Sequence, residues 1–218
     1  MLWKSNLDSD TRAAAALGPE IDRALRWCKK NHPPLGFVSV ADGPGSFTGL
    51  RIAVTTAKTL SYALAIPLVA VDSLAAIAAS VFHDHRSVDS LIVALNAYRG
   101  QVFHGAFDRS ELLVDLADLP PGGSATRKWA AHPETVGIDE GEAWQRILQG
   151  RRPGQSVAGD ASPLGELAND RCERSCDAVG VGLLGLRSAI CNDWVDPISL
   201  VPRYLKPSAA EEKLKVTD

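Results

Sequence analysis

The sequence predicts an α/β protein built around a parallel sheet, and two repeated patterns indicate this fold class. A short apolar run at residues 37–41 is followed by a glycine-rich stretch and a long helical pattern at residues 51–65. A second apolar run at residues 68–71 leads into a helical pattern at residues 74–81. Strands and helices that alternate in this way form parallel strands joined by helical crossovers.

The first helix is expected at residues 19–30, beginning at Pro19, because apolar side chains recur there at helical spacing. Pro33 and Pro34 follow it and end it, since proline lacks the backbone donor that a helix needs. Ser73 is expected to cap the helix at residues 74–81.

The second half of the chain has a mixed pattern. Two apolar strands at residues 91–97 and 101–107 flank Tyr98-Arg99-Gly100, which predicts a β-hairpin with an exposed tip. Residues 117–137 are rich in proline, glycine and polar side chains and are expected to form a loop. Later elements are expected as helices at 140–148, from Ser162-Pro163 onward and at 179–190, and as a short strand at 156–158. We divide the chain into an N-terminal lobe at 1–98, a C-terminal lobe at 99–206 and a flexible tail at 207–218.

Composition limits the class of protein. The chain has 218 residues, 45% of them hydrophobic, and a net charge of −3, which argues against an independent nucleic-acid binder. The four cysteines at 28, 172, 176 and 191 are expected to be reduced thiols, and Cys172 and Cys176 have the spacing of one helix face. No histidine lies near Cys172 and Cys176 in the sequence, so a metal site there is not favoured. No apolar run reaches membrane-spanning length, and we expect a cytoplasmic protein.

The glycine-rich stretch is the main candidate site. A strand, a glycine turn and a helix start leave backbone N–H groups that can bind an anion. A P-loop would continue with lysine, and a nucleophile elbow would centre its serine between glycines; neither pattern is present. Anion binding and a tight turn, with Ser46 or Thr48 as a helix cap, remain the two interpretations. The candidate anion-binding residues are Gly43, Pro44, Gly45, Ser46, Phe47, Thr48, Gly49 and Arg51.

Three segments together resemble the TsaB (YeaZ) family, bacterial partners in forming threonylcarbamoyladenosine at position 37 of tRNA. They are Asp42-Gly43-Pro44-Gly45-Ser46-Phe47-Thr48-Gly49-Leu50-Arg51, Ile66-Pro67-Leu68-Val69-Ala70-Val71-Asp72-Ser73-Leu74 and Asn96-Ala97-Tyr98-Arg99-Gly100-Gln101-Val102-Phe103. Weaker similarity returns at Ala158-Gly159-Asp160 and at Val201-Pro202-Arg203-Tyr204-Leu205-Lys206.

The resemblance implies a two-lobed fold of the actin-like ATPase and sugar-kinase class, the ASKHA fold. Family members begin with a strand of the form I-L-A-I-D-T-S, whereas this chain begins with Met1-Leu2-Trp3-Lys4-Ser5. We therefore expect an incomplete N-terminal lobe whose remaining strands expose apolar edges.

Few side chains have the pattern of a catalytic group. The TsaD paralogue has a metal-binding H-x-x-x-H motif, but residues 71–78 here contain no histidine, and His83 and His85 would point to different helix faces. Asp42 can be a catalytic acid or a turn former. Lys58 is expected to be solvated or paired, and the partner of Arg51 is left open.

The resemblance implies a non-catalytic scaffold subunit that pairs with a TsaD-like catalytic subunit and a TsaE-like ATPase, or forms a homodimer. It implies no tightly bound cofactor, with ATP only in the assembled complex and tRNA contacted only through it. The alternative is a nucleotide-dependent phosphotransferase using the 43–49 loop. The expected partner interface comprises Ile21, Leu25, Ala53, Ala57, Leu60 and Leu64, although an intramolecular core has the same pattern.

Overall fold

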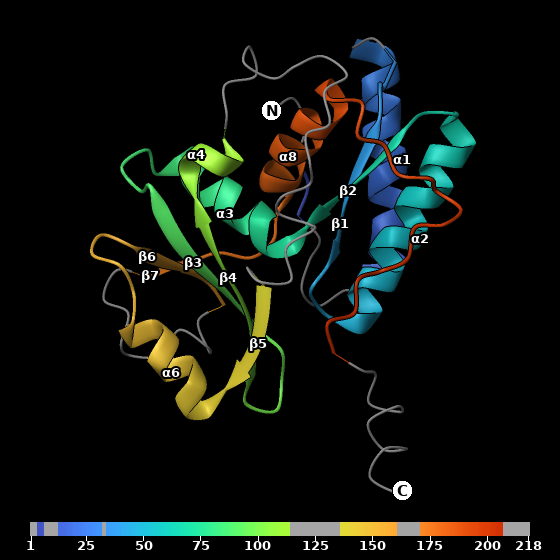
Figure 1. The fold of residues 1–218 in the computed structure, drawn as a ribbon. Coiled ribbons are helices and arrows are strands. Elements are labelled where there is room, and N and C mark those ends of the chain that lie inside the picture. Colours follow the sequence, from blue (N-terminus) through green and yellow to red (C-terminus); the bar gives the residue numbers. More distant parts are fainter. Residues whose placement is uncertain (1–3, 7–12, 32–33, 114–135, 161–170, 207–218) are drawn as a thin grey trace, which may run out of the picture.

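Two sheets and the helices between and around them make up the fold (Figure 1). The computed structural model describes residues 4–6, 13–31, 34–113, 136–160 and 171–206. In chain order the elements are α1 (Ala13–Asn31), β1 (Val38–Gly43), α2 (Phe47–Leu64), β2 (Leu68–Asp72), α3 (Ser73–Asp84), β3 (Ser90–Asn96), β4 (Gln101–Asp108), α4 (Arg109–Leu112), β5 (Val136–Glu140), α6 (Gly141–Gln149), β6 (Ser156–Gly159), β7 (Arg171–Glu173) and α8 (Ala178–Ile190).

The first sheet pairs β1 with β2 in parallel, with Val40 opposite Ala70, which confirms the predicted parallel pair. Helix α2 packs on one face, where Val54 and Ala57 meet Val40. Helix α8 lies on the other face, where Ser39 donates a hydrogen bond to the carbonyl oxygen of Val181 at 3.1 Å. Successive side chains of a strand point to opposite faces, so neighbouring residues 39 and 40 meet different helices.

The second sheet has the order β5-β4-β3-β6-β7. The β3–β4 pair is an antiparallel hairpin, as predicted, and β3 pairs with β6 in parallel. Helix α6 covers one face by packing Trp144 and Leu148 against Ile92 and Val157. Helix α3 covers the other face, so both faces of the sheet contribute to a core.

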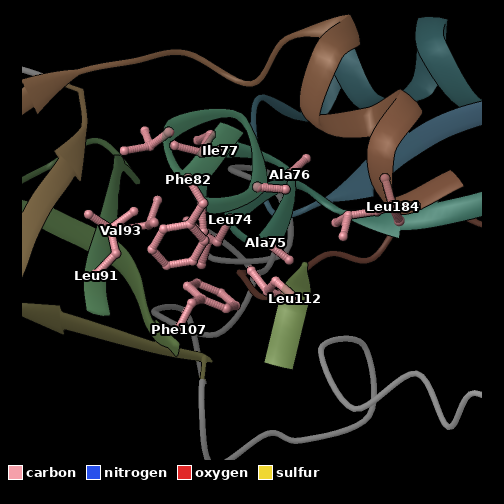
Figure 2. Close-up of a cluster of buried hydrophobic side chains, with 14 of the residues drawn as sticks. Leu74, Ala75, Ala76, Ile77, Phe82, Leu91, Val93, Phe107, Leu112 and Leu184 are labelled. Atoms are coloured by element: carbon pink, nitrogen blue, oxygen red, sulfur yellow. The ribbon is translucent and has the colours of Figure 1, made fainter. Parts of the chain in front are cut away.

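Helices α3 and α8 lie between the two sheets and form the centre of the molecule (Figure 1). All residues from Ser73 to Phe82 are buried, so α3 contacts protein on every side. Figure 2 shows Phe82 of this helix together with Leu91 and Phe107 of the second sheet. Gly180 allows α8 to approach closely, because a Cβ there would lie 1.8 Å from the carbonyl oxygen of Ala76. This observed arrangement is the α/β fold that the sequence predicted.

Several predicted boundaries are corrected. Helix α1 begins at Ala13, because the alanine-rich run before Pro19 has high helix propensity and extends the helix through the proline. Strand β1 continues to Gly43, and α2 begins at Phe47, four residues before the expected start at Arg51. Asp72, and not Ser73, caps α3.

Two short strands were missed. Strand β5 occupies residues 136–140, where a loop and then a helix start were expected, and it pairs with β4. Strand β7 was also missed: Cys172 lies on it and Cys176 lies in the segment between β7 and α8, so the expectation of a shared helix face is wrong. The predicted loop at 117–135, the helix from Ser162 and the tail at 207–218 lie outside the described residues.

Among the described helices, none has the length and apolar character needed to cross a bilayer.

Candidate functional site

The glycine-rich stretch joins the carboxyl end of β1 to the start of α2. The Ser46 hydroxyl accepts a hydrogen bond from the Gly49 amide at 3.3 Å, and the Ser46 carbonyl oxygen accepts one from the Leu50 amide at 2.9 Å. Ser46 is therefore the N-cap of α2, which agrees with the capping interpretation. Thr48 and Gly49 are exposed in the first turn of the helix.

A segment from the end of the chain crosses this loop. We call residues 196–206 the C-terminal strap, and they follow α8 and run along α2 toward the end of β1 (Figure 1). The Arg203 amide donates to the Asp42 carbonyl oxygen at 2.7 Å. Gly43 has φ +136°, and a Cβ at this position would lie 2.5 Å from the Arg203 carbonyl oxygen. Only glycine fits where the strap meets the loop.

Arg203 forms the main polar contact of the site. Its guanidinium donates to the Gly43 carbonyl oxygen at 2.7 Å and forms an ion pair with Asp72. The Asp72 carboxylate is fully buried, and its Oδ1 accepts from the Ala75 amide at 2.7 Å as the cap of α3. Burial lowers the pKa of Arg203, and the charge of Asp42 opposes this shift. One buried carboxylate therefore holds the start of α3 and the C-terminal strap together.

Other strap contacts hold the segment along its length. The Lys58 ammonium donates to the Leu200 carbonyl oxygen at 2.8 Å and to that of Ile198 at 3.2 Å, so the prediction that Lys58 is solvated or paired resolves as paired. Tyr204 stacks on Phe47 with ring centroids 4.4 Å apart. Lys206 donates to the Ala97 carbonyl oxygen at 3.2 Å, beyond the end of β3.

The strap thus contacts the carboxyl ends of β1 and β2 and reaches the end of β3. Ligands of open α/β sheets usually bind just beyond the carboxyl ends of the strands. Asp160 directly follows β6, the parallel neighbour of β3, and its carboxylate accepts a hydrogen bond from the Asn96 amide at 2.8 Å. In the described structure, the carboxylates of Asp72 and Asp160 at the strand ends therefore bond groups of the chain itself. The strap adds two basic side chains at these ends: Arg203 pairs with Asp72, and Lys206 bonds the Ala97 carbonyl oxygen.

Arg51 lies outside this arrangement. Its guanidinium lies 5.6 Å from the centre of the Phe47 ring and is exposed. With Thr55 and Thr56 it lines a hollow of about 440 Å³ between α1 and α2. Of the candidate anion-binding residues, Gly43 and Pro44 are buried and Gly45 is half-buried, so the exposed part of the loop begins at Ser46.

The residues expected at a partner interface fall into two groups. Ala57 is 5% exposed and belongs to the core beneath α2, and Ala53 packs against the same core. These two alanines are therefore part of a core within the chain, which was the alternative to a partner interface. Leu25 and Leu64 line an apolar groove of about 380 Å³, which we call the α1–α2 groove. Its other lining residues are Cys28, Lys29, Pro34, Leu35 and Ile66, while Ile21 and Leu60 are half-buried elsewhere on the two helices.

Metal ligands do not gather in the described residues, where no group of three or more histidine, cysteine or acidic side chains has suitable geometry. His83 lies in the last turn of α3 and His85 caps its end. His85 contacts Cys172, with Nε2 and Sγ 3.9 Å apart.

Sequence reasoning missed the Arg203–Asp72 pair. Arg203 and Asp72 are 131 positions apart, and each lies in a segment that carries the family resemblance. The sequence of these segments indicated that they matter but not that the two residues are in contact. The available signal was a carboxylate at the end of an otherwise apolar strand, because a carboxylate that is buried with its strand needs a partner.

Comparisons with known proteins agree on one group. A family model described as "TsaD: tRNA N6-adenosine threonylcarbamoyltransferase" matches residues 10–120, just over half of the chain. A TsaB protein of Bacillus subtilis is 41% identical over 98 residues, which are 44% of this chain and 41% of the relative. A TsaB protein of Buchnera aphidicola from Acyrthosiphon pisum is 37% identical over 93 residues, 43% of this chain and 42% of the relative. The matched stretch therefore spans less than half the length of these relatives.

Solved structures extend the likeness over most of the fold. YeaZ from Pseudomonas aeruginosa has a TM-score of 0.65 and 17% identity, and the alignment covers 89% of this chain and 86% of that one. A second Pseudomonas aeruginosa structure, described as an uncharacterized protein with similarity to peptidase YEAZ, has a TM-score of 0.67 and 17% identity, covering 90% and 85%. At this identity the likeness concerns the fold alone.

Proposed function

We propose a function that starts from the family to which the chain belongs, the TsaB (YeaZ) family within the larger family that the TsaD model describes. The chain is a non-catalytic subunit in the formation of threonylcarbamoyladenosine on tRNA. In this proposal it pairs with a TsaD-like subunit that carries the catalytic site. The curated relatives are named as biosynthesis proteins for this nucleoside, which supports the pathway.

The α1–α2 groove is the observation that carries the pairing proposal. Leu64 is 39% exposed at its edge, and Leu35 is exposed to the same degree. Exposed apolar side chains that meet around one groove are typical of interaction sites, because burying them against a partner removes apolar surface from water. Lys29 lies at the same groove and favours a partner surface with an acidic side chain.

The C-terminal strap supports the non-catalytic part of the proposal. A nucleotide phosphate at the 43–49 loop would need the free amides at the start of α2. The Gly49 amide is taken by Ser46, and Gly43 at the start of the loop is packed against Arg203. These contacts do not favour the alternative of a phosphotransferase that uses this loop.

Reconstitution of the modification tests the proposal. The chain is mixed with the TsaD-like and TsaE-like subunits of its own genome, tRNA and threonylcarbamoyl adenylate, and threonylcarbamoyladenosine is measured by mass spectrometry of the digested tRNA. We expect product with the wild-type chain and with Leu186→Asp, and loss of product without the chain or with Leu64→Asp. Leu186, at 40% exposed on α8, is a matched control for Leu64.

Two results would contradict the proposal. Product formation that is unchanged when the chain is omitted would remove it from the reaction. Tight ATP binding by the isolated chain, with ATP hydrolysis that Ser46→Ala abolishes, would instead support the phosphotransferase alternative.

A further inference from the structure

A cysteine, a histidine and an arginine come together at the end of α3, away from the glycine-rich loop. Cys172 lies on β7, the strand at one edge of the second sheet, and is half-buried. Its Sγ lies 3.9 Å from the Nε2 of His85, which is exposed at the C-terminal end of α3. A thiol beside an imidazole can transfer its proton to the ring, which leaves the nucleophilic thiolate.

Arg174 adds positive charge next to this pair. Its guanidinium forms ion pairs with Asp84 and, at 3.7 Å, with Asp177, which Lys4 also approaches at 4.0 Å. Burial acts to lower the pKa of Arg174, but its hydrogen bond to Asp84 and the charges of Asp84, Cys172 and Asp177 raise it overall. Asp84 and Asp177 are both ion-paired with Arg174, so any repulsion that these carboxylates exert on a thiolate is weakened.

The other three cysteines have different surroundings. Burial, with a smaller contribution from the charge of Asp177, raises the pKa of Cys176 to about 12, so this side chain stays a thiol at neutral pH. Cys191 is buried at the end of α8. Cys28 is half-buried in the α1–α2 groove and is the appropriate internal reference for Cys172.

We propose that Cys172 is a thiol modification site, activated by His85 and Arg174, that reacts with small electrophiles such as hydrogen peroxide. Nothing in the proposed scaffold function requires this reactivity, so the two proposals are tested independently of each other.

The reaction with peroxide is balanced by groups already present. His85 takes the proton of the Cys172 thiol, and the thiolate attacks one peroxide oxygen. The S–O bond forms as the O–O bond breaks, so the sulfur loses two electrons and the peroxide gains them. The hydroxide that leaves takes the proton back from the imidazolium. The products are a sulfenic acid at Cys172 and water, and a cellular thiol can reduce the sulfenic acid.

Competition among the cysteines of one molecule measures the proposal directly. The full chain is treated with a limiting amount of hydrogen peroxide, sulfenic acids are trapped with dimedone, and the labelled positions are found by peptide mass spectrometry. A protease other than trypsin is needed, because Arg171 and Arg174 enclose Cys172 in a very short tryptic peptide. We expect label on Cys172 first, with little on Cys28 and none on Cys176.

Two histidine variants separate activation from structure. His85→Gln keeps a polar side chain but cannot take the proton, so we expect the labelling rate of Cys172 to fall about 5-fold while that of Cys28 is unchanged. His83→Gln, two residues earlier on α3, is the matched control and should change neither rate. Equal Cys172 rates in the His85→Gln variant and the wild type, or faster labelling of Cys28 than of Cys172 in the wild type, would overturn the proposal.

Discussion

At the residue scale, Asp72 connects the strand β2, the helix α3 and the C-terminal strap. Its fully buried carboxylate accepts hydrogen bonds from the Ala75 amide and the Arg203 guanidinium. A buried charge that loses its partner destabilises the fold strongly, because water cannot replace the lost interaction. Arg203 has more freedom, since 26% of its side chain is exposed.

We therefore predict an asymmetry between the two partners. Arg203→Ala leaves the Asp72 carboxylate buried and should lower the free energy of unfolding by about 3 kcal/mol. Asp72→Asn keeps a good helix cap and leaves an arginine that water can reach, so it should cost about 1 kcal/mol. Urea unfolding followed by circular dichroism measures both.

Arg51→Ala is the control for this pair, because the exposed Arg51 only lies over the Phe47 ring and should contribute less than about 1 kcal/mol. If Arg203→Ala cost no more than Arg51→Ala, the strap would not be held by the buried ion pair.

Residue roles could be predicted where they depend on neighbours in sequence. Ser46 lies directly before a helix and caps it, as one of the two interpretations held. Asp42 contacts Arg203 through its backbone, and this contact follows only from the folded chain. Ala57 shows the same limit, because a small apolar residue on a helix fits a partner interface and a core equally well until the sheet is in place.

At the scale of elements, the close contact of α3 and α8 defines the centre of the fold. It depends on Gly180, which faces the backbone of Ala76 with no room for a side chain. Gly182, two residues later on α8, has open space around the same position. Alanine substitutions at the two positions therefore separate the effect of the contact between α3 and α8 from the effect of helix propensity.

We predict opposite effects of alanine at these positions. Gly180→Ala should force α8 away from α3 and lower the free energy of unfolding by about 3 kcal/mol. Gly182→Ala should raise it by about 0.5–1 kcal/mol, because alanine favours a helix more than glycine does. Thermal unfolding of both variants tests this, and similar values for the two would mean that α3 and α8 are not in close contact.

Strands and helices were predictable where hydrophobic periodicity alone determines them. The hairpin of β3 and β4 and the helix α8 agree closely with their patterns. Strands β5 and β7 are short and each borders one existing strand, so their own residues carry too weak a pattern to reveal them. Their formation depends on the exposed edges of β4 and β6.

At the scale of the whole molecule, the described residues leave an apolar groove open between α1 and α2, while the C-terminal strap covers the ends of β1 and β2. The strap occupies the strand ends that commonly bind ligands, and the α1–α2 groove stays accessible. This distribution agrees with the proposed subunit that works through a partner.

Light scattering after size-exclusion chromatography tests this central claim most directly. The chain is measured alone and mixed with the TsaD-like subunit of its own genome. We predict a stable species with the mass of one copy of each, retained with Leu186→Asp and lost with Leu64→Asp. A folded, monodisperse chain that forms no such species, or a Leu64→Asp variant that pairs as well as the wild type, would contradict the account.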